Sequence, residues 1–185
     1  PDGRKLAWLS WNHPSMPWTE AKLWLADVLD DGTLDTPRVI AGGENESICQ
    51  PEWSPDGHLY FVSDRSDWWN LYRHEESGAV ALCQMSAEFG SPQWQFGKSM
   101  YGFVSTTEIA CTYIEKGISH LACINLKEGT LRKIDIPYTD IQDLRVESGC
   151  LLMIAGSPTV PLEIVRIQFK NELESKVCEV LARSM

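Results

Sequence analysis

The stretch from Gln50 to Arg73, QPEWSPDGHLYFVSDRSDWWNLYR, decides how the rest of the chain is interpreted. A turn, Ser54-Pro55-Asp56-Gly57, separates two short runs of β-forming residues. Pro55 presets φ for this turn, and Gly57 accepts the positive φ that closes it. A second polar turn, Ser63–Asp67, leads into a third run. The stretch therefore predicts three short strands joined by two turns.

The same turn opens the chain as Pro1-Asp2-Gly3, and the run Lys5–Ser10 that follows it parallels His58–Ser63. The chain begins on a turn residue and not on Met, and its start lacks the charged and apolar regions of a signal peptide. We therefore expect a fragment of a longer protein that begins inside a repeat.

A further copy of the pattern is predicted at offsets of 40 to 42 residues from the first stretch, and a weaker copy after it. In the weaker copy Asp140–Val146 is the first strand and Leu151–Ala155 the second. The matches in the nearer copy are Pro92-Gln93-Trp94 with Pro51-Glu52-Trp53, Gly97 with Gly57, and Phe103–Ser105 with Phe61–Ser63. This alignment makes Trp94 and Gly97 part of the sheet framework.

Each copy also contains a third and a fourth run of β-forming residues, and several alternate apolar with polar side chains. The third runs are 22–26, 70–73, 119–124 and 162–167; the fourth runs are 37–41, 79–84, 130–134 and 176–181. A short helix over 172–181 is the alternative for the tail. Units of four strands must stack to bury their apolar faces. The prediction is an all-β chain, a single partial β-propeller segment of about three and a half to four blades, each a four-stranded antiparallel sheet, with blades at approximately 1–46, 47–86, 87–137 and 138–185.

Composition restricts the class of protein further. The chain has 185 residues, 43% of them hydrophobic, which is enough for a core, and it has no apolar run of membrane-spanning length. The formal charge of −10 argues against nucleic acid as a partner. The six cysteines form no Cys-x-x-Cys pair, and most have apolar neighbours, which indicates buried, reduced thiols and a cytoplasmic protein.

The repeat resembles that of TolB-type propellers and of peptidases of the prolyl oligopeptidase clan. The resemblance rests on Trp53-Ser54-Pro55-Asp56-Gly57, on Ser63-Asp64-Arg65 and on Asn70-Leu71-Tyr72. The extended form, Ser63–Arg73 followed by Ala87–Trp94, is most similar to the acylaminoacyl-peptidase and dipeptidyl-aminopeptidase branch.

The resemblance implies an N-terminal propeller of seven or eight blades followed by an α/β-hydrolase domain with a Ser-Asp-His triad. It implies that the propeller restricts access and helps to select peptides. The hydrolase domain is absent from this chain, and the expected partners are that domain and a peptide substrate, with no membrane partner. Open blade edges also predict self-association.

A direct search for chemistry finds no catalytic, cofactor-binding or metal site. There is no Gly-x-Ser-x-Gly nucleophile elbow, and the nearest string, Gly97–Gly102, has the wrong spacing. No His-x-x-x-His, calcium loop or phosphate-binding glycine loop occurs. Dipeptidyl peptidases hold a substrate amine with propeller glutamates, but Glu44 and Glu46 lack the helical insertion of that family and are interpreted as a solvated loop. Arg65 is expected to pair with a neighbouring blade.

Tryptophan is the one unusual surface feature. Trp18 lies in a long loop between second and third strands, and Trp68 and Trp69 lie in the equivalent connection one blade later. Long loops commonly carry binding residues, although these side chains could equally pack between blades. The candidate contacts with a substrate or another domain are Trp18, Trp68, Trp69 and Arg65.

The leading hypothesis is a noncatalytic propeller segment that gates access and selects peptides for the hydrolase domain of a serine peptidase. The first alternative is a TolB-like interaction scaffold with no peptidase domain, which an upstream export signal would favour. The second is an independent esterase.

Overall fold

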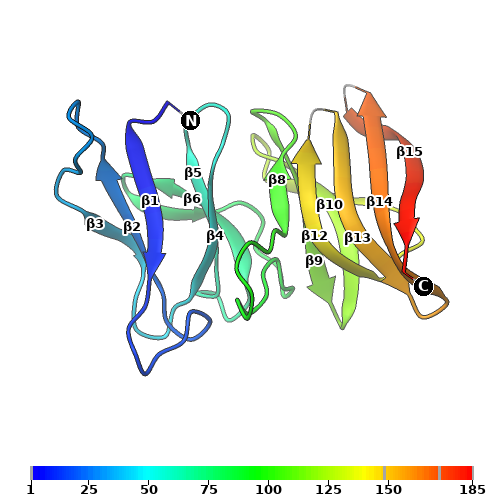
Figure 1. Cartoon of the computed structure of the whole chain (residues 1–185), viewed down its shortest axis with the longest axis horizontal. Coiled ribbons are helices and arrows are strands. Elements are labelled where there is room, and N and C mark those ends of the chain that lie inside the picture. The colour runs from blue at the N-terminus through cyan, green and yellow to red at the C-terminus, as the bar shows by residue number, and fades with distance from the viewer. Residues whose placement is uncertain (1, 148, 171, 185) are drawn as a thin grey trace. The chain divides into compact units, whose positions relative to one another are not determined.

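A computed structural model describes residues 2–147, 149–170 and 172–184, with side chains described for all of these except 170 and 172–177. The described residues form strands and turns with no helix (Figure 1). The chain divides into two compact units. The first unit comprises Pro1–Met85 and Gly90–Phe96, and the second comprises Ser86–Phe89 and Gly97–Met185.

The first unit contains a three-stranded and a four-stranded antiparallel sheet. The strand order is β1-β2-β3 in one sheet and β4-β5-β6-β7 in the other. The bounds are β1 Lys5–Ser10, β2 Lys22–Asp27, β3 Arg38–Gly42, β4 Ile48–Trp53, β5 Leu59–Ser63, β6 Asn70–Glu75 and β7 Gly78–Ala81.

The second unit contains two four-stranded antiparallel sheets, ordered β8-β9-β10-β11 and β12-β13-β14-β15. The bounds are β8 Tyr101–Phe103, β9 Glu108–Glu115, β10 Ile118–Asn125, β11 Thr130–Ile134, β12 Asp140–Glu147, β13 Cys150–Ser157, β14 Val160–Lys170 and β15 Glu172–Arg183. The predicted all-β partial propeller of about four blades is confirmed, and each blade is a meander of sequential strands.

The quoted hairpin forms as predicted. The backbone N–H of Ser54 donates to the carbonyl of His58 at 2.8 Å, and the N–H of Gly57 donates to the carbonyl of Ser54 at 3.0 Å. Gly57 has φ of 88°, the left-handed conformation that glycine adopts readily. The buried Ser54 hydroxyl also donates to the Asp56 carboxylate at 2.6 Å. The turn is thus closed by backbone and side chain together.

The alignment proposed for the third sheet is wrong. Pro92-Gln93-Trp94 is not a strand, and Trp94 is 71% exposed. Tyr101–Phe103 is the first strand of its sheet. The N–H of Val104 donates to the carbonyl of Glu108, and this hydrogen bond corresponds to the one from Ser54 to His58 in the quoted hairpin. The true match to the quoted hairpin therefore lies fifty residues later. A turn without proline or glycine closes the same hairpin, so a search for Pro and Gly misses it.

The tail forms strand β15, which pairs with β14, so the alternative of a short helix is wrong. Buried Glu163 on β14 links the two: it accepts from Arg183 Nε at 2.7 Å and from the Tyr138 hydroxyl at 2.8 Å.

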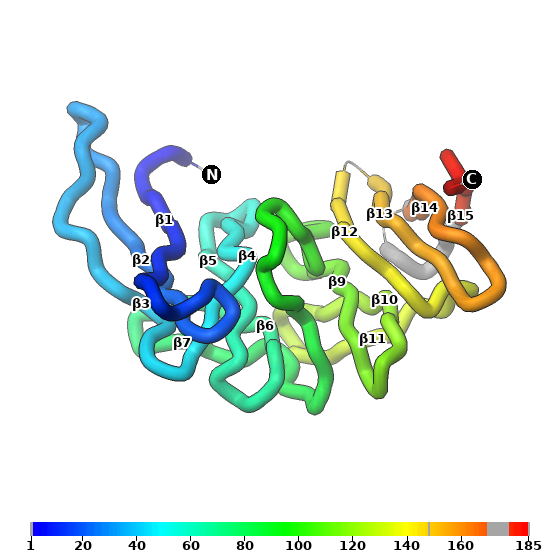
Figure 2. Tube along the Cα trace, turned by 60° about the horizontal axis from the view of Figure 1, so that its bottom comes forward, coloured from blue at the N-terminus to red at the C-terminus, as the bar shows by residue number. Residues whose placement is uncertain are grey.

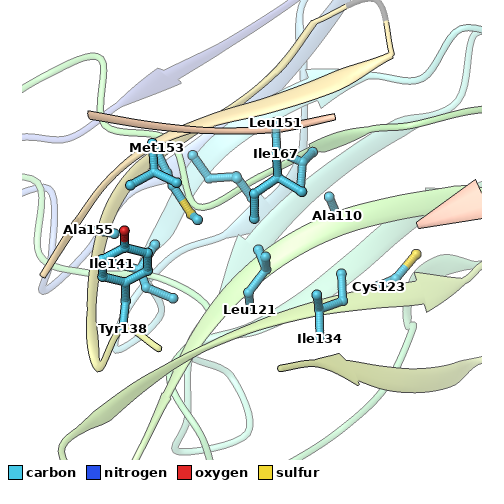
Figure 3. Packing of buried hydrophobic residues seen from close by; sticks show 12 residues of the cluster. Ala110, Leu121, Cys123, Ile134, Tyr138, Ile141, Leu151, Met153, Ala155 and Ile167 are labelled. Carbon is cyan, nitrogen blue, oxygen red and sulfur yellow. The ribbon is translucent and has the colours of Figure 1, made fainter. Parts of the chain in front are cut away.

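Each unit has its own core. Leu23, Ile48, Phe61 and Tyr72 pack together in the first unit, where the Phe61 and Tyr72 rings stack at 6.0 Å. In the second unit Leu121, Leu151, Met153 and Ile167 pack from facing strands (Figure 3). These side chains occupy alternate positions along their strands, as period-two patterning requires. Each sheet is therefore stabilised by its neighbour within the unit, as stacked blades must be.

Candidate functional site

The long loops of the first unit turn at one end of its two sheets. Successive strands are antiparallel, so the connections 11–21, 43–47 and 64–69 and the segment that follows β7 all leave from that end. The backbone of Ala21 donates to the Glu46 carbonyl at 3.1 Å, which joins the first two of these connections. Figure 2 shows the chain path through these loops. We call this end of the first unit the loop end.

A polar network fixes the loops against one another. The Ser47 hydroxyl donates to the Pro17 carbonyl at 2.5 Å, and the Ser47 N–H donates to Asp64 Oδ1 at 2.7 Å. Burial raises the pKa of the Asp64 carboxyl, although the hydrogen bond from Ser47 opposes the shift. Three separate loops thus meet at Ser47.

Glu46 is the second junction of this network. Its Oε1 accepts from the Ser63 hydroxyl at 2.6 Å and from Arg65 Nε and Nη2 at 2.9 and 2.8 Å. The Arg65 guanidinium also lies 5.2 Å from the centre of the Tyr72 ring. The interpretation of Glu46 as a solvated loop residue is therefore wrong, because its carboxylate is engaged by two partners.

Aromatic side chains cover part of the loop end. The Trp18 and Trp94 rings lie 4.0 Å apart, and the Trp11 and Phe96 rings 6.0 Å apart. Phe96 is 75% exposed and Trp94 71% exposed. We call these four residues the aromatic face. Large aromatic groups left in contact with water are a common mark of an interaction site.

The predicted site residues have different environments. Trp18 belongs to the aromatic face, and Trp68 is exposed at the same end. Trp69 packs over Gly90, where an added Cβ would lie 2.7 Å from the Trp69 ring. Arg65 is bound to Glu46.

Sequence reasoning missed Trp94 and Phe96 as surface residues, since Trp94 was aligned with a strand. The signal that could have identified them is the preceding Gly90-Ser91-Pro92, which disfavours a strand.

The cysteines and the possible metal-ligating side chains of the described residues are the groups that redox or metal chemistry would use. The six cysteines form no disulfide bond within the described part of the chain, and Cys49, Cys111 and Cys123 are buried. Burial raises the pKa of the Cys123 thiol to about 12, which keeps it protonated at neutral pH. Within the described ranges no three His, Cys, Asp or Glu side chains gather in a way that could hold a metal ion. No described helix could span a membrane.

The comparisons connect this fold to known proteins. A puromycin hydrolase of known structure is 36% identical over 91% of the chain, with a TM-score of 0.84. A puromycin-hydrolyzing peptidase of Mycobacterium tuberculosis is 31% identical over 99% of the chain, with a TM-score of 0.90. The chain spans 26% and 27% of the lengths of these two proteins. No protein-family model matches the chain, and no curated protein matches it.

More distant structures share the fold alone. A prolyl endopeptidase is 16% identical with a TM-score of 0.70 over 98% of the chain and 25% of its own length. TolB from Acinetobacter baumannii is 11% identical with a TM-score of 0.52 over all of the chain and 54% of its own length.

The chain is therefore a segment of a β-propeller built from TolB-like blades. More particularly, it is a propeller segment of the prolyl oligopeptidase clan of peptidases, similar to that of the puromycin hydrolases.

Proposed function

We propose that this chain is the noncatalytic propeller segment of a cytoplasmic serine peptidase. It gates access to an α/β-hydrolase domain of the same full-length protein and selects the peptides that reach it. One observation carries the proposal: the identity to puromycin hydrolases covers nearly the whole chain but only about a quarter of their length. The parent protein then acts on puromycin or on short or N-acylated peptides.

The aromatic face is the part of the first unit best suited to this role. Trp18 and Trp94 present a large, rigid apolar surface, which costs little conformational entropy to bind. Such a surface fits an apolar peptide side chain or the hydrolase domain itself. Trp68, exposed at the same end, extends the apolar surface available there.

The open sheet edges support a second part of the proposal. Among the described strands β1 pairs only with β2, so its other side offers free backbone donors and acceptors. We expect the isolated chain to self-associate through such an edge.

Kinetics of the full-length parent test the gating role. Trp94→Ala is expected to lower kcat/KM for puromycin and for tripeptide amides by about 10-fold, the effect of losing one anchor residue that becomes buried on binding. Leu34→Ala is the matched control, because Leu34 is exposed on the β2–β3 connection at the opposite end. An unchanged kcat/KM in Trp94→Ala, relative to the unmodified full-length protein, would contradict the role of the aromatic face. A full-length protein with no hydrolase activity would favour the TolB-like scaffold.

A further inference from the structure

A cavity opens at the end of the first unit that lies opposite the loop end. It has a volume of about 490 Å³ and is lined from both sheets, by Lys5 of β1, Arg38 of β3 and His74 of β6 among others. A smaller pocket of about 280 Å³ shares Lys5 and Trp53 with it. The two form one polar hollow with an aromatic wall.

Two cations in the lining of this hollow, Lys5 and Arg38, lack an acidic partner in the described part of the chain. Among the residues that the structure describes, the side chains of Lys5 and Arg38 make no ion pair. The buried Nδ1 of His74 has no hydrogen-bond partner in the same set of residues. An unpaired polar atom away from water costs free energy, so such an atom in a native structure calls for a ligand or water.

Most carboxylates around the hollow are already engaged. Glu75 binds Arg73, Asp56 accepts from the Ser54 hydroxyl, and Asp2 lies 4.0 Å from Arg4. Glu76 is the remaining acidic residue of the lining, and its side chain is exposed. The chain has 26 acidic and 16 basic residues, yet no carboxylate of the described residues forms an ion pair with Lys5 or Arg38.

We propose that this hollow binds a small oxyanion, a carboxylate or a phosphate group, held between Lys5, Arg38 and His74. The guanidinium of Arg38 offers two parallel donors that match the oxygens of either group. The ammonium of Lys5 adds a third donor, and the imidazole of His74 adds a further polar contact. Trp53 forms an apolar wall for whatever group carries the anion.

The electrostatics of His74 agree with this arrangement. Burial lowers the pKa of His74, and the charges of Arg38 and Lys5 lower it further, with no carboxylate acting in the opposite direction. A bound anion would supply that missing negative charge. The site lies at the end away from the aromatic face, so it does not depend on the proposed peptidase function.

Calorimetric titration of the whole chain at low salt tests the proposal, with inorganic phosphate in one arm and N-acetylglycylglycine in the other. Low salt preserves the charge interactions that screening would weaken. Lys5→Gln and Arg38→Gln are each expected to weaken binding about 10-fold, as loss of one charge-assisted contact does. Lys127→Gln and Arg132→Gln remove the same charges from exposed positions of the second unit and are expected to leave binding unchanged.

The titrations distinguish a phosphate site from a carboxylate site and both from the absence of a site. Binding of phosphate alone, or of the peptide carboxylate alone, identifies the source of the oxyanion and supports the site. Binding of neither, or equal weakening by the control variants, would overturn it. Lys5 and Arg38 are both exposed residues, so both variants are expected to fold, and either one remains informative if the other does not fold.

Discussion

The β4–β7 sheet and the β8–β11 sheet have the same strand order, and the connection between their second and third strands differs most in length. Between β5 and β6 the chain makes a wide loop, Asp64–Trp69, whereas between β9 and β10 it turns on Lys116-Gly117. Lys116 and Gly117 have φ of 52° and 80°, the positive values that a two-residue hairpin turn requires. The strands on either side pair in register in both sheets.

This difference shows that the wide loop is not needed to form the hairpin. Its extra residues include Arg65, which binds Glu46, and Asp64, which binds Ser47. They fix connection 43–47, and Ser47 in turn binds Pro17 in the loop that carries Trp11 and Trp18. The aromatic face that we propose as a binding surface therefore lies beside the sheet with the long connection.

Gly42→Ala should have the largest effect on stability and would test whether the loop end is closely packed. Gly42 has φ of 85°, and an added Cβ would lie 1.9 Å from the Ala21 carbonyl oxygen. We expect a loss of at least about 3 kcal/mol in the free energy of unfolding, measured in urea.

Gly117→Ala is the matched control at the tight turn. It has a similar φ of 80° but no atom within 4 Å of the added Cβ. Only the backbone strain of about 1–2 kcal/mol applies there. If Gly117→Ala and Gly42→Ala lost the same free energy of unfolding, close packing at the loop end would not explain the effect of Gly42→Ala.

Glu46→Ala should have an intermediate effect. It removes the acceptor of the Ser63 hydroxyl and of Arg65, and it leaves the buried Ser63 without that bond. We expect a loss of about 1–3 kcal/mol in thermal or urea unfolding. Glu115→Ala, at the tight turn, is the control and should change stability by less than about 0.5 kcal/mol. A neutral Glu46→Ala would show that the network does not hold the loops.

Asp64→Asn should have the smallest effect, and that effect should depend on pH. The pKa of Asp64 is raised above 3.8 chiefly by burial, so the folded chain binds this proton more tightly than the unfolded chain. The stabilisation from protonated Asp64 is therefore lost as pH rises from about 3.8 through the raised pKa. Asparagine keeps an acceptor for Ser47 and carries no charge.

The difference in melting temperature between Asp64→Asn and the unmodified chain should therefore grow in favour of the variant from about pH 4 to about pH 7. Asp135→Asn, at an exposed position of the second unit, serves as the control. A difference that is constant with pH would show that the Asp64 carboxyl is well solvated.

Most strands could be predicted from local pattern, because alternating residues and turn residues act over a few positions. Leu59–Ser63 and Asn70–Glu75 are examples, with Gly57 at the turn before them. The strand Tyr101–Phe103 was assigned to the wrong place in its sheet, because its hairpin closes on Ser105 and Thr107 without proline or glycine. The candidate site was predicted less well: Trp18 and Trp68 were identified as surface candidates, whereas Trp94 was placed in a strand.

The amino-acid sequence by itself determined that this protein is a series of short antiparallel strands arranged as propeller blades. Strand patterning and turn chemistry are local, and the period of two needs no distant partner. Only the tertiary structure decided that Trp94 would meet Trp18, that Glu46 would hold Arg65, and that Lys5 and Arg38 would remain without an ion pair among the described residues. These contacts join segments far apart in the chain, so their geometry is set by how the sheets pack and not by any local pattern.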